Sequence, residues 1–126
     1  MKYLIMIFSN PESRRIWEQF SDAERERGWA EHFNLVDDLA ASGELVAVHG
    51  LVDPSRSKRV FVRDGVTVAT DGPFAESKEY LAGFFVVECE SIERAVEHAG
   101  RIPEAAHGLV EVRPVIDASG PTGRFS

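Results

Sequence analysis

The chain has 126 residues, 44% hydrophobic and 28% charged, a composition typical of one globular domain with its own core. Its 21 acidic against 14 basic residues give a net charge of −7, which argues against a nucleic-acid-binding surface. The single cysteine, Cys89, excludes an internal disulfide and indicates a reducing, cytoplasmic setting. No run approaches the roughly 20 apolar residues of a membrane span, so no membrane partner is expected.

The first half of the chain predicts a strand and a long helix. Residues 3–8 are apolar throughout, which is typical of a central strand covered on both sides. A short helical turn is expected near residues 13–20. A capping box of Ser21 and Glu24 then predicts a helix from about residue 22 to 41, ending at Gly43. Its apolar residues follow helical spacing and predict one face packed on a sheet; they are Trp29, Phe33, Val36, Leu39 and Ala40.

The rest of the chain predicts three strands, a hairpin and another helix. Residues 45–51 alternate like a strand, which places His49 on one face with Leu45, Ala47 and Leu51. Asp64-Gly65 then predicts a two-residue hairpin turn. The remaining expected elements are a strand over residues 83–89, a helix from Ser91 to about Gly100 and a strand over residues 109–115.

Together these elements predict one α+β domain over residues 1–116 and a C-terminal extension over residues 117–126. The order β-α-β-hairpin-β-α-β is the ferredoxin-like split βαβ pattern, with an antiparallel sheet and an inserted β-hairpin. Two helices cover one face of such a sheet, yet the strand Phe84-Phe85-Val86-Val87 is apolar on both faces. A second copy of the chain is the simplest cover, so the expected partner is the protein itself, in a homodimer packed sheet to sheet.

The most distinctive motif is Asp71-Gly72-Pro73-Phe74, followed at once by Ala-Glu-Ser-Lys-Glu. With Leu81-Ala-Gly-Phe-Phe, Val110-Glu-Val-Arg-Pro-Val and the first strand, it resembles the YCII-related family, in the branch named for the Asp-Gly-Pro-Phe motif. That resemblance implies a dimeric α+β barrel of two ferredoxin-like subunits. It also implies a His–Asp pair in a cleft, with the histidine eleven residues before a helix-ending glycine, as His32 stands before Gly43.

His32 and Asp71 are therefore the candidate catalytic residues. An imidazole beside a carboxylate can move a proton near neutral pH, with Asp71 orienting the ring and His32 acting as acid or base. The alternative is structural: His32 packs and bonds Asp71 or a backbone carbonyl. An aspartate before Gly-Pro can likewise serve only its own turn.

Four residues are candidate substrate contacts: Trp29, His49, Phe74 and Arg113. A pocket lined by Phe8, Trp29, Phe74 and Phe84 would favour an apolar or aromatic substrate, and the fork of Arg113 suits a carboxylate. Glu111 and Arg113 share a strand face, so they can instead pair with each other or hold the partner subunit. No spacing matches a zinc or iron site or a phosphate-binding loop, so no metal and no cofactor are expected.

Two functions remain open. The first is a small cytoplasmic homodimer that performs cofactor-free acid–base chemistry, an isomerisation or elimination, on a small organic molecule. The second is a non-catalytic ligand-binding or protein-interaction module, because members of the family resemble accessory domains beside or fused to transcription regulators of the sigma-factor type. The first predicts His32 and Asp71 converging in a closed cleft, and the second an exposed apolar patch outside the dimer interface.

Overall fold

The computed structural model describes residues 1–72 and 78–116. All the predicted helices and strands are present, and the first helix is longer than expected because Asn10 caps it and Pro11 begins it. The elements are β1 (Lys2–Ser9), α1 (Pro11–Gln19), α2 (Asp22–Ser42), β2 (Leu45–Gly50), the 3₁₀ turn η1 (Pro54–Arg56), β3 (Lys58–Arg63), β4 (Val66–Asp71), β5 (Tyr80–Glu88), α3 (Ile92–Ala99), the 3₁₀ turn η2 (Pro103–His107) and β6 (Val110–Pro114).

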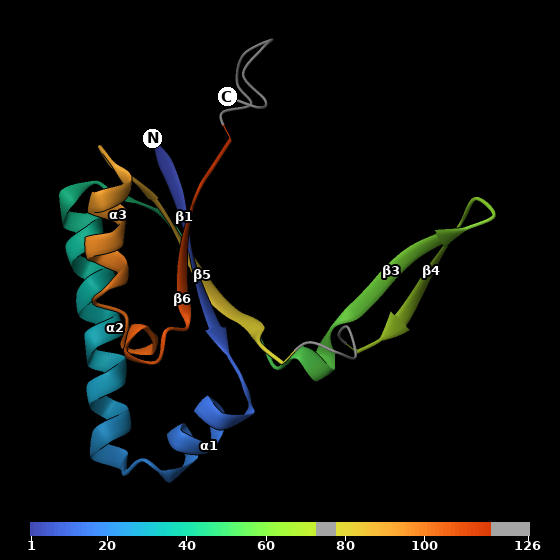
Figure 1. Ribbon diagram of the computed structural model, residues 1–126, viewed down its shortest axis with the longest axis horizontal. Coiled ribbons are helices and arrows are strands. Elements are labelled where there is room, and N and C mark those ends of the chain that lie inside the picture. The colour runs from blue at the N-terminus through green and yellow to red at the C-terminus, as the bar shows by residue number, and fades with distance from the viewer. Residues whose placement is uncertain (73–77, 117–126) are drawn as a thin grey trace.

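Four strands form an antiparallel sheet in the order β2-β5-β1-β6, and β3 and β4 pair separately as a hairpin. This is the strand order of a ferredoxin-like fold with an inserted hairpin, so the predicted α+β class is confirmed. Figure 1 shows α2 and α3 on one side of the sheet, while the hairpin projects from the other side.

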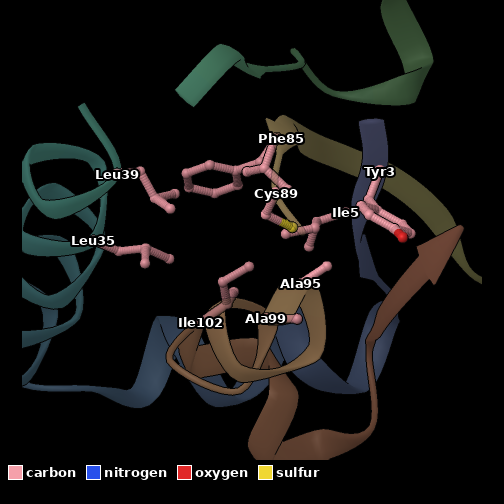
Figure 2. Close-up of a cluster of buried hydrophobic side chains, with 10 residues drawn as sticks. Tyr3, Ile5, Leu35, Leu39, Phe85, Cys89, Ala95, Ala99 and Ile102 are labelled. Atoms are coloured by element: carbon pink, nitrogen blue, oxygen red, sulfur yellow. The ribbon is translucent and has the colours of Figure 1, made fainter. Parts of the chain in front are cut away.

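The core lies between the sheet and the two helices. Ile5 and Phe85 on the two central strands meet Leu35 and Leu39 of α2, and α3 adds small residues such as Ala95 that allow close packing. Figure 2 shows the Phe85 ring directed toward Leu39. Phe85 is 0% exposed and is the largest fully buried side chain, so it fills the centre of the domain.

The buried face of α2 differs from the predicted one. Leu35 and Leu39 are buried, whereas Trp29 and Phe33 are 54% and 57% exposed. The first turns of α2 lie beside α1 and not against the sheet (Figure 1), and Arg25 bonds the Glu18 carbonyl there at 2.7 Å. The helical period was right, but the sheet reaches only the second half of the helix.

A bulge in β2 corrects a second expectation. The pairing of β2 with β5 shifts between Leu45 and Ala47, so Leu45 pairs with Val87 and packs on the core. His49 instead pairs with Phe84 on the opposite face. Strict alternation had put Leu45 and His49 on one face, and the extra residue in the strand reverses that relation.

Gly43 ends α2 in a left-handed conformation, with φ of 79°. We expect Gly43→Ala to lower the free energy of unfolding by about 1 kcal/mol, because a Cβ there strains the backbone while meeting no atom within 4 Å. Urea unfolding measures this cost. The control is Gly100→Ala at the end of α3, where φ is −63° and alanine fits the helical backbone; equal losses at both positions would contradict the argument.

Candidate functional site

The structure separates the residues predicted to form one site. Trp29 and His32 lie on α2, on the helix side of the sheet. His49 and Arg113 lie on the opposite face, since they pair in register with Phe84 and Leu4. The sheet therefore stands between the two groups within one chain.

Asp71 belongs to neither group. It ends β4 at the root of the hairpin, where its carboxylate pairs with Lys58 and is 83% exposed. The Gly72 N–H donates to the Ser57 carbonyl at 2.8 Å and closes the root. Within one chain Asp71 makes no contact with His32, so the structure does not bring the predicted pair together.

The predicted aromatic pocket is corrected for the same reason. Trp29 lies on the helix side and Phe84 on the open side of the sheet, because neighbouring residues of a strand point to opposite faces. The ring of β5 that reaches His32 is that of Phe85. Phe74, with the rest of residues 73–77, lies outside the described residues.

His32 lies within a group of aromatic rings, here called the aromatic cluster: Trp17, Trp29, His32, Phe33 and Phe85. The His32 ring centroid is 5.4 Å from that of Phe33, 5.6 Å from Phe85 and 5.9 Å from Trp29. Gly28 makes room for Trp17, since a Cβ there would lie 3.3 Å from its ring. Buried Phe85 forms the floor of the cluster, and exposed Trp29 and Phe33 form its rim.

The surroundings of His32 favour its neutral form. Partial burial lowers the pKa of the imidazole below its usual value. No described residue forms a hydrogen bond with either ring nitrogen. A neutral imidazole with an unshared lone pair is a base available to a ligand.

A titration of His32 tests this directly. We expect its pKa, followed by NMR of the ring protons, to lie below the ordinary value near 6.5. Phe33→Ala should raise it by admitting water, whereas Val60→Ala on the distant hairpin should leave it unchanged. Because the folded-state pKa is lowered, the unfolded chain binds the proton more readily, so this group reduces stability as pH falls through 6.5. A His32 pKa at or above the ordinary value would contradict the argument.

Glu104 is a candidate that the sequence analysis missed. It lies on η2, which contacts both α2 and β1. Burial raises the pKa of its carboxyl group. Burial thus raises the pKa of a carboxyl group on η2 and lowers the pKa of an imidazole on the adjoining α2. Groups whose pKa values are shifted apart in this way are candidates for proton exchange with a substrate. The available signal was one acid within the apolar stretch Ile102-Pro-Glu-Ala-Ala.

The sheet face turned away from the helices is apolar at its centre, and we call it the open face. Met6 pairs with Phe84 on one side and with Glu111 on the other. As predicted, Glu111 and Arg113 share this face, but neither forms an ion pair with a described residue. The open face comprises Leu4, Met6, Ala47, His49, Phe84, Val86, Glu111 and Arg113.

A polar cluster at the start of β2 is the best-connected ionic group. The Glu44 carboxylate accepts from Arg94 at 3.1 and 3.3 Å, from His98 at 3.0 Å and from Ser42 at 2.8 Å. Arg94 first, then His98, lower the pKa of Glu44 to about 2. With its oxygens occupied by protein donors, Glu44 fastens α3 to the α2–β2 corner.

The described parts of the chain offer little for other chemistry. Burial raises the pKa of the Cys89 thiol, which bonds the Ser91 carbonyl at 3.4 Å and is a poor nucleophile. Within residues 1–72 and 78–116, no three of His, Cys, Asp and Glu are grouped to hold a metal ion. No helix in those ranges combines the length and apolarity needed to cross a membrane.

A family model described as the YCII-related domain matches residues 1–119. The chain belongs to the YCII-related family. A relative from Rhizobium meliloti (strain 1021), "Uncharacterized protein R00369", is 30% identical over 117 residues, which cover 91% of this chain and 92% of the relative. The branch named for the Asp-Gly-Pro-Phe motif stays a prediction, since the family model that matches is described only as the YCII-related domain.

A solved structure shares the fold of this YCII-related chain. It is 5-chloro-2-hydroxyhydroquinone dehydrochlorinase (TftG) from Burkholderia phenoliruptrix AC1100, in complex with 2,5-dihydroxybenzoquinone. The TM-score is 0.50 at 17% sequence identity, covering 90% of this chain and 92% of the other. At this identity the likeness concerns the fold alone.

Proposed function

We propose that this YCII-related protein is a cofactor-free acid–base enzyme acting on a small organic molecule, with His32 as the proton-transfer residue. One observation carries the proposal: the His32 imidazole, without a hydrogen bond to any described residue, stands within 6 Å of three aromatic rings. Such a group can take a proton from a bound substrate and return one to it.

The aromatic cluster favours a flat, ring-shaped substrate. Rings of Trp29 and Phe33 beside the imidazole can stack on a planar ligand. The fold neighbour is named a dehydrochlorinase and is bound to a dihydroxybenzoquinone. By analogy with this neighbour, we propose a hydroxylated, halogen-bearing aromatic ring as the substrate class of this protein. His32 would take the substrate proton, the electron pair left behind would form the new π bond, and halide would leave with the electrons of its bond to carbon.

Two carboxyl groups are candidates for the second proton-transfer role. Glu104 is in the same chain, on an element that touches α2. Asp71, the partner predicted from the sequence, ends β4 in the hairpin that projects from the side of the sheet opposite α2 (Figure 1), so it would serve His32 from a second chain. Variants of the two residues distinguish these arrangements.

The proposed enzyme is a homodimer that covers its open face with a second copy. Leu4, Phe84 and Val86 form an apolar strip there, and no described helix covers it. Burying such a strip against its own copy is the usual solution for a sheet with helices on one side. Light scattering over a range of concentrations tests this, and a constant monomer mass would refute it.

Halide release from a panel of chlorinated and non-chlorinated hydroxyhydroquinones tests the activity. His32→Ala should lower kcat/KM by about 10²–10⁴, whereas His49→Ala, on the other face of the sheet, should lower it far less. If Glu104 is the second proton-transfer group, Glu104→Gln should lower kcat/KM severely and Asp71→Asn only mildly. If Asp71 acts from the partner, an inactive His32→Ala chain mixed with an inactive Asp71→Asn chain regains activity in the mixed dimer. Full turnover by His32→Ala would remove the proposed mechanism.

A binding module is the second candidate, and the exposed rim of the aromatic cluster favours it. Trp29 and Phe33 lie outside the open face and are more than half exposed, as a contact surface would be. Under this alternative, ligand binding measured by tryptophan fluorescence would be lost in Trp29→Ala and kept in His32→Gln. No member of the panel would be turned over.

A further inference from the structure

The hairpin of β3 and β4 lacks the support that such an element needs. Its two strands pair only with each other among the described strands. An isolated two-stranded hairpin is marginal in water. Figure 1 shows it projecting well beyond the domain, away from both helices that build the core. Something outside the described part of this chain is therefore needed to stabilise it.

Both faces of the hairpin carry apolar side chains. Val60 and Val62, on one face, are 65% and 68% exposed. Phe61 pairs with Val68 on the other face. A hairpin packed on its own domain would carry polar side chains on its outer face. Apolar side chains on both faces therefore indicate an element that packs against a surface of another molecule.

The hairpin also differs in charge from the rest of the chain. Of the 14 basic and 21 acidic residues, residues 54–71 hold four basic and two acidic, a net +2, which leaves ten basic and nineteen acidic, a net −9, elsewhere. The positive side chains surround a hollow of ≈ 510 Å³ on β3, here called the basic hollow. Its lining is Lys58, Arg59, Val60, Phe61 and Arg63, with the Arg63 guanidinium 5.0 Å from the Phe61 ring centre.

A hollow of opposite charge lies on the domain itself. This acidic hollow, ≈ 340 Å³, is lined by Phe8, Glu79, Gly108, Val110 and Glu111. Glu111 is also the edge residue of the open face, where it pairs in register with Met6. The acidic hollow is thus continuous with the surface that the proposed dimer covers.

We infer that the hairpin is an arm that docks on a second copy of this chain, with its basic hollow against the acidic hollow of that copy. A two-fold axis makes the contact twice, since each copy supplies one arm and one acidic hollow. Opposite charges fix the register, and Val60, which lines the basic hollow, adds apolar contact area. The inference rests on the proposed dimer but not on the proposed activity.

The root of the arm is held in a way that suits this role. The Arg14 guanidinium on α1 lies 2.6 Å from the Asp53 carboxylate, just before η1. Asp53 also accepts from the Ser55 N–H at 2.9 Å. The arm therefore leaves the domain from an anchored turn, and a fixed direction lowers the entropy lost on docking.

Charge reversal tests the arm in the full-length protein. Dimer dissociation constants would be measured by sedimentation at low salt for three variants: arm reversal (R59E with R63E), hollow reversal (E79K with E111K), and both in one chain. We expect each single reversal to weaken the dimer by at least about tenfold and the combined chain to return to within about threefold of wild type. R27E, at an exposed position on α2, is the matched control and should change the dimer dissociation constant little.

The outcomes separate the possible failures. A wild-type chain that stays monomeric overturns both the arm and the proposed dimer. A wild-type dimer unchanged by either reversal, or weakened by both without recovery in the combined chain, overturns the arm alone and leaves the sheet-to-sheet dimer. Halide release is a separate readout. If the protein is inactive in that assay but its dimers show the expected dissociation constants, the inference about the arm stands.

Discussion

Alanine in place of Phe85 should lower the free energy of unfolding by about 3–5 kcal/mol. Phe85 is 0% exposed, lies at the centre of the core and packs toward Leu39 of α2 (Figure 2). Its removal leaves a cavity that the sheet and α2 cannot close, because both are fixed by neighbouring contacts. Chemical unfolding followed by far-UV circular dichroism measures the loss.

The control for this prediction is Phe33→Ala. Phe33 is the same residue type and also lies against His32, but more than half of it is exposed, so we expect a loss below about 1 kcal/mol. Phe85→Ala should also raise the pKa of His32, since the buried floor of the aromatic cluster is then gone. Similar losses of stability for the two variants would show that the core is centred elsewhere.

The fold was predictable because its signals are local. The capping box of Ser21 and Glu24 starts α2 as expected, with bonds of 3.0 and 3.2 Å between the two residues. Asp64 and Gly65 adopt φ of 52° and 76°, which a tight two-residue hairpin turn requires. Such motifs act within a few residues, so one sequence is enough to recognise them.

The errors arose where distant segments decide the outcome. Helical spacing put Trp29 and Phe33 in the core, but burial also depends on how far the sheet extends beneath α2. The bulge in β2 depends on how that strand pairs with β5, and it separated Leu45 from His49. Neither property is encoded within the segment it affects.

The candidate site shows the same limit. His32 was reached through the resemblance to the YCII-related family and its place before Gly43. Its aromatic surroundings were only partly foreseen, because Phe85 reaches it from across the core. The sequence predicts the Asp71 carboxylate beside it, yet Asp71 ends β4, and the hairpin of β3 and β4 projects from the side of the sheet opposite the helices (Figure 1). Glu44 and His98 are 54 residues apart, and no pattern in the sequence joins them.

Removing the Glu44 carboxylate should be the second most damaging change. Glu44→Ala leaves His98 buried without its acceptor and Arg94 without its main partner. Breaking a largely buried ionic cluster is costly, and because Arg94 can regain water we expect a loss of about 2–3 kcal/mol in the free energy of unfolding. The control is Glu97→Ala, which removes the exposed partner of the same arginine and should cost less than about 0.5 kcal/mol.

The pH dependence of stability separates this cluster from simple packing. The folded-state pKa of Glu44, about 2, lies below its ordinary value of 4.5. Its contribution is therefore complete above pH 4.5 and is lost as the pH falls from 4.5 towards 2. The stability difference between wild type and Glu44→Ala should accordingly shrink across that window, whereas Phe85→Ala should show a nearly constant difference. If the Glu44→Ala difference stayed constant as well, the carboxylate would contribute by its packing volume and not by its charge.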